Sequence, residues 1–238
     1  MSLNIVIFGA GIPGQFGYDF VQKVRGEGHN VTVFSHKEHI DKHPQNIAIQ
    51  YGNYEECEKI FDKFLLDNSS DIDLLIFNQS GGIYPVFNNN DGYRSPNLRE
   101  YQYTLNSQVV IPHLFIGKTI NKMKDGSKTI FFCNTSGLTQ EDRFREGTST
   151  LVGYVGANAW KVNMMYGYAK SRTKNITYCC LTPSIQYHTT EGKERYKNQD
   201  FNILYNWVFS VDDTANGKIK VYWGDPVVKT LETSYQAK

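Results

Sequence analysis

Two tyrosines in the segment GYVGANAWKVNMMYGYAKS have spacings that suit acid/base chemistry. Tyr166 and Lys170 form the pattern Tyr-x-x-x-Lys, which places a phenol and an ammonium group one turn apart on the same face of a helix. A lysine at that distance lowers the pKa of a tyrosine because its positive charge favours the phenolate. Tyr154 has Asn158 at this spacing, and Lys161 lies only a further turn along. Position in the fold must decide which tyrosine lies at a site.

A glycine-rich turn near the N-terminus has the spacing of a phosphate cradle. Gly9, Gly11, Gly14 and Gly17 contain the pattern G-x-G-x-x-G, between an apolar run and a segment of helical period. Without side chains, such a turn lets a pyrophosphate approach the backbone amides and the positive end of the following helix. The alternative is that these glycines only allow a tight turn and bind no ligand. At the first strand-to-helix turn, however, we expect them to bind a dinucleotide.

The residues after the second apolar run bear on the choice of dinucleotide. Ser35, His36 and Lys37 follow this run, where an acidic side chain would accept hydrogen bonds from the adenosine ribose. The acidic residue is absent and two basic side chains are present. This favours NADP, with its extra phosphate, over NAD, which stays possible; the alternative is an ordinary exposed turn.

Three histidines near this turn suggest a metal site at first sight. His36, His39 and His43 offer imidazole nitrogens, but no neighbouring residue in the sequence completes a ligand set. We therefore expect solvated histidines and no metal.

Composition limits the possible classes of protein. The chain has 238 residues, of which 40% are hydrophobic and 21% charged, with a net charge of +1. This predicts one globular domain, 1–238, without a general field for nucleic acid or anionic membranes. The N-terminus looks like a strand rather than a signal peptide, and no run is long enough to span a membrane, so we expect a cytoplasmic protein. Cys57, Cys133, Cys179 and Cys180 show no C-x-x-C spacing and no disulfide framework.

Apolar runs that alternate with helical segments predict the fold. We expect about seven short strands, most of them separated by segments of helical period, in a Rossmann-type, doubly wound parallel α/β sheet with helices on both faces. Ligands of such sheets bind at the carboxyl ends of the strands. The expected strands are residues 4–8, 30–34, 46–50, 73–77, 128–132, 176–181 and 218–223.

Beyond the glycine turn, the order of several fragments resembles the short-chain dehydrogenase/reductase family over nearly the whole chain. DLLIFNQSGG is similar to the family's Asn-Asn-Ala-Gly segment, but it keeps only Asn78 and has Ser80 within it. The stretch from Pro183 to Thr189 is similar to the family's Pro-Gly-x-x-x-x-Thr stretch, which faces nicotinamide. The resemblance implies that these four residues contribute to cofactor binding.

The resemblance also implies the catalytic roles. In the family a tyrosine exchanges a proton with the substrate oxygen, a serine holds that oxygen, an asparagine holds a relay water, and a lysine lies one turn after the tyrosine. By motif, the asparagine is Asn106 and the serine is Ser136, with Thr135 as the close alternative. The substrate class implied is a small carbonyl compound or alcohol.

Spacing to the sixth strand selects the tyrosine. Pro183 follows Tyr154 by 29 positions, which leaves room for about five helical turns and the strand, but it follows Tyr166 by only 17. Tyr154 is therefore the expected acid/base. Tyr166 and Lys170 fall near the end of the helix, where we expect a packing and surface pair.

Asn158 then occupies the position of the family's lysine. Asparagine can bind a ribose but cannot lower the tyrosine pKa, and losing a shift of two to three pKa units costs about 3–4 kcal/mol of proton-transfer driving force. We expect Lys161, two turns from Tyr154, to be too far for the usual contact. Two interpretations stay open: an NADP(H)-dependent reductase or dehydrogenase with an altered catalytic pair, and a non-catalytic nucleotide-binding sensor or interaction protein.

Two expectations concern the remaining surface. Residues 186–206 are rich in tyrosine, asparagine and charge, which fits a lid on the substrate side. The segments 98–123 and 154–171 carry apolar and aromatic residues on more than one face, so we expect a homodimer or homotetramer.

Overall fold

One sheet organises the molecule. The computed structural model describes residues 2–79, 87–88, 92–93, 98–133, 152–171, 174–183, 201–222 and 229–231. Within these residues an eight-stranded sheet has the order β10-β9-β8-β7-β4-β1-β2-β3, and a separate two-stranded sheet pairs β5 with β6. The strands are β1 (Asn4–Phe8), β2 (Asn30–His36), β3 (Asn46–Ile49), β4 (Ile72–Phe77), β5 (Phe87–Asn88), β6 (Gly92–Tyr93), β7 (Met123–Phe132), β8 (Thr177–Pro183), β9 (Lys218–Tyr222) and β10 (Lys229–Leu231).

Seven strands, β1 to β4 and β7 to β9, pair in parallel, and only the short β10 runs antiparallel within this sheet. The chain winds from β1 outward to β3, returns to β4 on the other side of β1, and then continues outward to β9. The predicted doubly wound parallel sheet is confirmed, and β10 is an addition at its edge.

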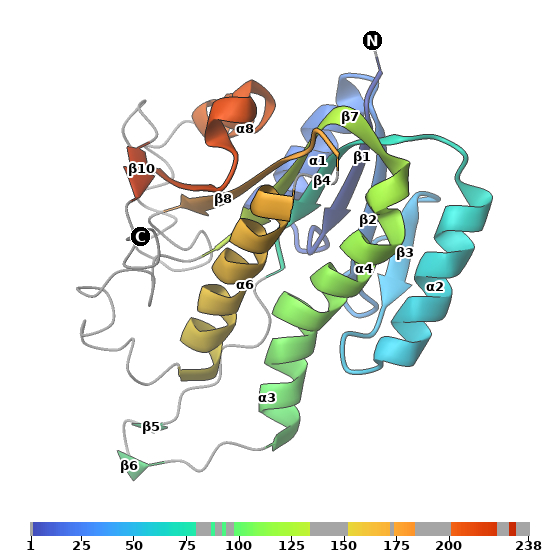
Figure 1. The fold of residues 1–238 in the computed structure, drawn as a ribbon. Helices are drawn as coiled ribbons and strands as arrows, with labels where there is room; N and C mark the ends of the chain where they lie inside the picture. The colour runs from blue at the N-terminus through green and yellow to red at the C-terminus, as the bar shows by residue number, and fades with distance from the viewer. Residues whose placement is uncertain are drawn as a thin grey trace.

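Helices cover both faces of the sheet, as Figure 1 shows. Helices α2, α4 and α6 bury apolar side chains in the core on one face, whereas α1 and α8 do so on the other. The helices are α1 (Phe16–Gly26), α2 (Tyr54–Asp67), α3 (Leu98–Leu105), α4 (Ile111–Thr119), α6 (Val152–Ser171) and α8 (Phe201–Ser210).

Alternation along each buried strand supplies both cores at once. In β1, Val6 and Phe8 belong to the core under α2, α4 and α6, while Ile5 and Ile7 belong to the core under α1 and α8. Strands covered on both faces have no polar side to display, which explains why they were recognisable as continuous apolar runs.

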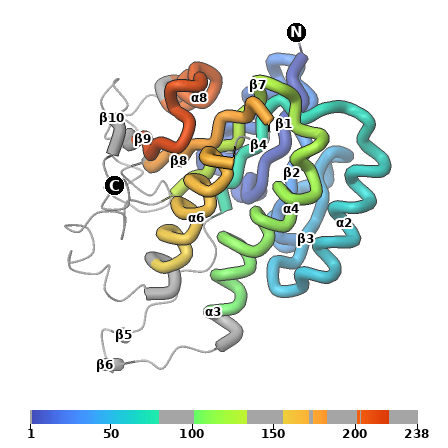
Figure 2. Tube along the Cα trace, in the orientation of Figure 1, coloured from blue at the N-terminus to red at the C-terminus, as the bar shows by residue number. Residues whose placement is uncertain are grey.

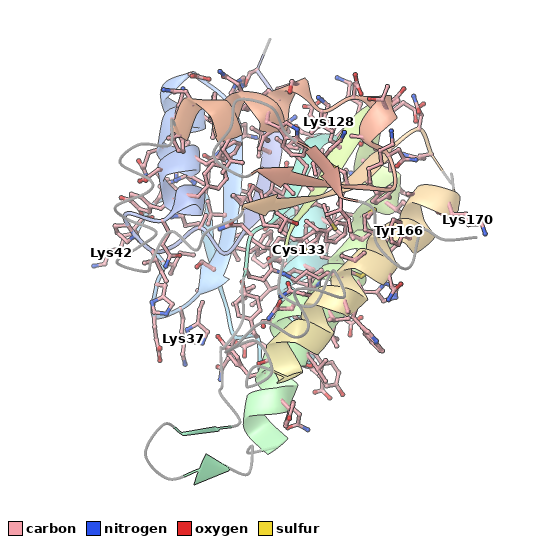
Figure 3. All side chains as sticks on the ribbon, turned by 90° about the vertical axis from the view of Figure 1, so that its left-hand side faces the viewer. Lys37, Lys42, Lys128, Cys133, Tyr166 and Lys170 are labelled. Carbon is pink, nitrogen blue, oxygen red and sulfur yellow. The ribbon has the colours of Figure 1, made fainter. Side chains whose placement is uncertain are left out.

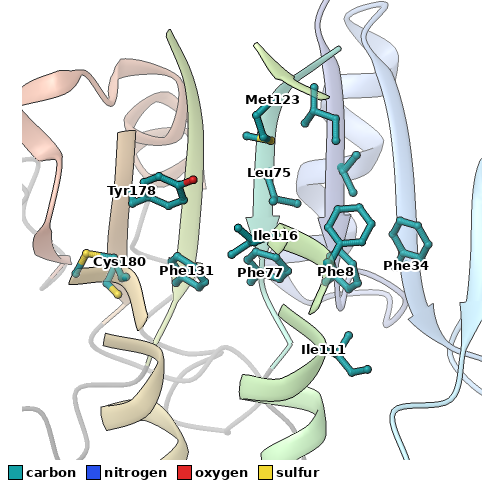
Figure 4. Packing of buried hydrophobic residues seen from close by; sticks show 14 of the residues in the cluster. Phe8, Phe34, Leu75, Phe77, Ile111, Ile116, Met123, Phe131, Tyr178 and Cys180 are labelled. Atoms are coloured by element: carbon teal, nitrogen blue, oxygen red, sulfur yellow. The ribbon is translucent and has the colours of Figure 1, made fainter. Parts of the chain in front are cut away.

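A layer of phenylalanine rings fills the first core near the carboxyl ends of the strands (Figure 4). The ring of Phe115 from α4 contacts the rings of Phe8 and Phe61 edge-on, with centroids 4.9 Å away in each case. Phe77 and Phe131 stack with centroids 5.2 Å apart. These rings fix the positions of β1, β4 and β7 just below the edge where a ligand would bind.

The segment 98–123 differs from one continuous helix. A π-helical turn, Asn106–Val110, separates α3 from α4, and a 3-10 turn, Ile120–Lys122, leads into β7. The tube in Figure 2 shows α3 and α4 following one another along the same direction. Among the described helices, none combines the length and apolar character needed to cross a membrane.

Candidate functional site

The carboxyl ends of β1, β4 and β7 meet at one edge of the sheet. The register pairs Phe8 with Phe77 and Phe77 with Phe131, so the residues that follow these strands are neighbours. This edge is where parallel sheets bind ligands. Most of the described residues that the sequence marked as functional follow these strands or lie beside this edge.

The glycine turn is packed tightly against the end of β4. Gly9 has a φ of 76°, and a Cβ added there would lie 2.6 Å from the Cα of Gln79. Asn78 donates a hydrogen bond from Nδ2 to the carbonyl oxygen of Gly9 at 2.8 Å. A side chain on Gly17 would collide with the same Asn78 amide. Small residues are therefore required by the protein's own packing.

Gly14 differs from Gly9 because the space above it is open. Its φ is 75°, yet among the described residues no atom lies within 4 Å of a Cβ built at this position. The following helix, α1, has Gln15 as its N-cap residue, and the Gln15 side chain makes no capping hydrogen bond. Open backbone beside the amides at the start of a helix fits a bound phosphate.

The end of β2 closes one side of this turn. A Cβ on Gly11 would collide with the carbonyl oxygen of His39 and with Oγ of Ser35, so the segment after β2 lies directly on the turn. Ser35 is 3% exposed, His36 is partly buried, and Lys37 is exposed at the rim (Figure 3). The structure thus brings the predicted cofactor residues of β1, β2 and β4 together.

The histidines near this turn form a different group from the one considered in the sequence. Ligand atoms of His36, Glu38 and His39 all lie within 4.8 Å of one another, and His43 is not in the group. Nδ1 of His36 is 3.7 Å from the Glu38 carboxylate. Glu38 and His39 are exposed. The absence of a metal stays a prediction.

Helix α6 places a lysine at the centre of the edge. Lys161 is 1% exposed, and its Nζ donates to the carbonyl oxygens of Phe132 at 3.0 Å and Gln79 at 3.2 Å. The ammonium therefore joins the end of β7 to the end of β4. Burial lowers the pKa of Lys161, and the nearby thiols of Cys133 and Cys180 partly oppose that shift. Within the described part of the chain, this ammonium pairs with no carboxylate.

This position adds to what the sequence indicated about Lys161. The expectation that it lies too far from Tyr154 for the usual contact stays a prediction, because the Tyr154 side chain lies outside the described residues. What the sequence did not indicate is that the Lys161 side chain reaches the strand ends. Asn158, one turn earlier, is 0% exposed. The sequence did hold one signal for this placement. Lys161 follows Asn158 by three residues, and residues at that spacing share a helix face.

The π-helical turn brings Asn106 to the same region. Nε2 of Gln79 donates to the carbonyl oxygen of Ser107 at 2.9 Å, which ties the turn to the residues after β4. Oε1 of Gln79 is buried without a hydrogen-bond donor among the described residues. Single π turns in helices are frequent at functional sites. Asn106, at the start of the turn, is partly buried.

Tyr166 and Lys170 lie at the other end of α6, away from the edge that holds Cys133 (Figure 3). Tyr166 packs against the apolar core, and Lys170 is exposed. This placement agrees with the expected packing and surface pair. The sequence-based choice of Tyr154 rests on the same geometry, because it lies in the first turn of α6.

Several predicted site residues lie outside the described residues. Ser80, Thr135, Ser136 and Thr189 are among them, as are the side chains of Tyr154 and Pro183. Pro183 is the last residue of β8. Of the expected lid, only residues 201–206 are described; they begin α8, where Leu204 and Tyr205 are buried against α1.

Comparison with known proteins identifies the fold. No protein-family model matches the chain, and no curated protein matches its sequence. A short-chain dehydrogenase from Burkholderia cenocepacia in complex with NADP has 12% identity and a TM-score of 0.70, covering 94% of this chain and 97% of that chain. A short-chain dehydrogenase/reductase, glucose/ribitol dehydrogenase, from Brucella melitensis has 13% identity and a TM-score of 0.68, covering 95% and 97%.

A blue fluorescent protein from a metagenomic library, in complex with NADPH, has 14% identity and a TM-score of 0.67, covering 93% of this chain and 96% of that chain. At such identities the likeness concerns the fold. The chain is folded like the short-chain dehydrogenases over nearly its whole length.

Proposed function

We propose that the chain is an NADP(H)-dependent oxidoreductase of the short-chain dehydrogenase type, which reduces a small carbonyl compound or oxidises the corresponding alcohol. The observation that carries the proposal is the Lys161 ammonium, buried at the ends of β4 and β7 on the same helix as Tyr154. A buried cation without a carboxylate partner in the described part of the chain is costly for folding, so a role in chemistry accounts for it.

The glycine turn, Asn78 and the end of β2 would hold the cofactor. Open backbone at Gly14 and the start of α1 suit the pyrophosphate, and Lys37 with His36 suits the additional phosphate of NADP. When bound, NADP(H) supplies or accepts the hydride. The Burkholderia and metagenomic structures, which contain NADP and NADPH, support this choice.

Tyr154 would exchange the proton with the substrate oxygen, and Ser136 or Thr135 would hold that oxygen. Asn106 at the π-helical turn would hold a water that relays the proton. Seven residues along a helix span about 10 Å, where two charges interact by about 1–2 kcal/mol at an effective dielectric constant of 20. Lys161 can therefore replace about one pKa unit of the two to three that a lysine at Asn158 would supply.

The second candidate function is a nucleotide-binding sensor without turnover. Asn158 favours it, since this residue is fully buried where the resemblance places a lysine. Both functions use the same glycine turn, so cofactor binding does not separate them. Catalysis does.

Turnover of a generic dicarbonyl with NADPH tests the proposal. The wild-type chain should oxidise NADPH, and Tyr154→Phe should lower kcat/KM about 100-fold or more, as expected for loss of a general acid. Tyr166→Phe, on the same helix, is the matched control and should leave activity unchanged. Asn158→Lys should raise activity about tenfold or more, because it restores a charge one turn from Tyr154. Folded, NADPH-binding protein without turnover in both the wild type and Asn158→Lys would support the sensor.

Cofactor preference has its own test. Calorimetry should show tighter binding of NADPH than of NADH, and Lys37→Ala should reduce that difference while leaving NADH affinity unchanged. Equal affinities of the wild type for both cofactors would contradict the assignment of the β2 end to the phosphate.

We also propose that the chain pairs with itself through α3, α4 and α6. Leu105 of α3 is 41% exposed, Val110 of the π-helical turn before α4 is 39% exposed and Trp160 of α6 is 62% exposed, so this surface carries apolar side chains. Sedimentation should show a dimer or tetramer at micromolar concentration, and Trp160→Ser should weaken it. A monomeric wild type would refute this proposal.

A further inference from the structure

Two thiols touch each other beneath the carboxyl edge. Cys133 is the first residue after β7, and Cys180 lies in β8; their sulfur atoms are 3.6 Å apart. The register pairs Cys180 with Phe131, two residues before Cys133, so both side chains lie on the face covered by α6. The amide of Cys133 donates to the carbonyl oxygen of Leu181 at 3.0 Å, which fixes this diagonal arrangement.

The two thiols have unequal surroundings. The hydrogen bond between the Cys133 and Cys180 thiols and the charge of Lys161 lower the pKa of Cys133, against the opposing effect of burial. Burial raises the pKa of Cys180 well above its usual value. Cys133 is 5% exposed and Cys180 0%. The thiol that is more easily ionised is therefore also the one nearer to solvent.

The other two cysteines provide an internal reference. Cys57 in α2 donates its thiol to the carbonyl oxygen of Gln50 at 3.4 Å, and burial raises its pKa to about 11. Cys179 points to the opposite face of the sheet, and burial raises its pKa to about 12. Both are buried free thiols, and among the described residues neither has the sulfur contact that Cys133 has. The charges of Lys128 and Lys220 oppose the effect of burial on Cys179 only in part.

We propose that Cys133 and Cys180 are a redox-active pair that closes to a disulfide, with hydrogen peroxide or an organic hydroperoxide as the oxidant. The Cys133 thiolate attacks a hydroxyl oxygen of the peroxide and the O–O bond breaks, which gives a sulfenic acid at Cys133. The leaving hydroxide, or the alkoxide of an organic hydroperoxide, takes the proton that Cys133 lost and becomes water or an alcohol. Cys180 then attacks that sulfur, the S–O bond breaks, and the second hydroxide takes the Cys180 proton and leaves as water. Two thiols lose two electrons, and one peroxide gains them.

Closure requires a small movement. The sulfurs must approach by about 1.6 Å to reach the usual S–S bond length of about 2.0 Å. The bond would join β7 to β8 directly next to Phe132, whose carbonyl oxygen binds Lys161. It would also remove the ionisable thiol whose negative charge favours the charged form of Lys161. Oxidation would thus change the surroundings and the pKa of Lys161. The thiol chemistry itself does not depend on the proposed function.

Peptide mapping of the oxidised full-length chain tests the pair. The reduced wild type and a Cys57→Ala/Cys179→Ala variant are treated with hydrogen peroxide and digested without reductant. Both should lose two hydrogen atoms in intact mass and yield a Cys133–Cys180 cross-linked peptide, which dithiothreitol reverses. If the double variant does not fold, the wild-type map still decides the question.

Single variants test the order of the steps. Cys180→Ala should stop at a sulfenic acid on Cys133 that dimedone traps, whereas Cys133→Ala should leave Cys180 as slow as Cys57 and Cys179. Lys161→Met should slow the reaction of Cys133 about tenfold, the effect of about one pKa unit on the thiolate fraction.

Three results would overturn the proposal. They are no cross-link despite oxidation of Cys133, equal oxidation of all four cysteines, and no oxidation of any cysteine at peroxide concentrations that oxidise free cysteine. If Lys161→Met leaves the rate of Cys133 oxidation unchanged, Lys161 does not activate Cys133.

Discussion

Helices α1 and α6 cover opposite faces of the same sheet, and they bury different kinds of residue. The buried face of α1 consists of Phe16, Gly17, Phe20, Val21 and Val24. Helix α6 buries Val162 and Met165, but also Asn158 and Lys161. The buried face of α1 is therefore apolar, whereas α6 also buries polar side chains, whose desolvation opposes folding. This asymmetry agrees with the proposed function, in which the chemistry would lie on the α6 side and the phosphate would bind the backbone before α1.

The two sides also differ in how they tolerate change. On the α1 side the fold depends on ring contacts and on missing side chains. On the α6 side it carries an ammonium whose two hydrogen bonds to carbonyl oxygens offset part of its desolvation. Substitutions on the two sides should consequently separate stability from function.

The largest effect on stability is expected from Phe20→Ala in α1. Phe20 is fully buried, and its ring contacts Phe16, Tyr205 and Phe209. Truncation should lower the free energy of unfolding by about 3–5 kcal/mol. Urea denaturation measures this loss, and Leu66→Ala, at a side chain 86% exposed, should change stability by less than about 0.5 kcal/mol. Equal losses in the two variants would contradict the description of this core.

Gly9→Ala should have the next largest effect. The positive φ costs about 1–2 kcal/mol, and crowding against Gln79 adds about 1–3 kcal/mol. Gly14→Ala has the same φ penalty without the crowding, so it should cost only about 1–2 kcal/mol. Chemical denaturation of the two variants gives the difference. If Gly14→Ala is the more damaging, the space above Gly14 is not open.

The strands and the glycine turn could be predicted from the sequence, whereas several contacts at the site could not. The strand runs and the glycine turn were predictable because they follow from local pattern: apolar residues along a buried strand, and glycine where the backbone turns. The contacts of Lys161 were not predictable, because its helical phase is visible in the sequence but the path of its flexible side chain to two carbonyl oxygens is not. Contact between Cys133 and Cys180 depends on the register of β7 against β8, which no local pattern encodes.

The π-helical turn at Asn106–Val110 was missed for a related reason. Residues 98–123 have a helical pattern throughout, and one extra residue in a turn hardly disturbs it. The hydrogen bond from Gln79 to the Ser107 carbonyl is a tertiary contact with a residue 28 positions away. Long-range contacts of this kind decide the details of the site, while local pattern decides the architecture.

Lys161→Met should change how stability depends on pH. Burial lowers the folded-state pKa of Lys161 below its ordinary value of 10.5, so the unfolded chain binds more protons in the window just below that value. Wild-type stability should therefore rise with pH through this window, by about 1.4 kcal/mol for each unit of pKa shift, and the variant should lack this rise.

The comparison is best made in a Cys133→Ala background, in which the neighbouring thiol does not titrate. Denaturation midpoints of the two chains between neutral and alkaline pH provide the measurement. Parallel curves would mean that the ammonium is solvated rather than buried.

The smallest effect concerns the first residue before each helix. Gln15 provides no side-chain cap to α1, whereas Oδ1 of Asn53 accepts from the Glu56 amide at 3.1 Å at the start of α2. Gln15→Ser should stabilise the cofactor-free chain by about 0.5–1 kcal/mol, and Asn53→Ala should destabilise it by about 1 kcal/mol. Thermal unfolding of both variants tests the pair. A loss of stability in Gln15→Ser would show that the amides of α1 already have partners.

The strand order has a consequence for how the chain is assembled during synthesis. The first four parallel strands, β3-β2-β1-β4, come from residues 4–77 and form a contiguous half of the sheet. After β4, each new parallel strand joins the edge left by the previous one, from β7 to β8 to β9. A nascent chain emerging from the ribosome can therefore build the half of the sheet that carries the glycine turn first and use β4 as a template for the rest. No later strand has to be inserted between two that are already paired.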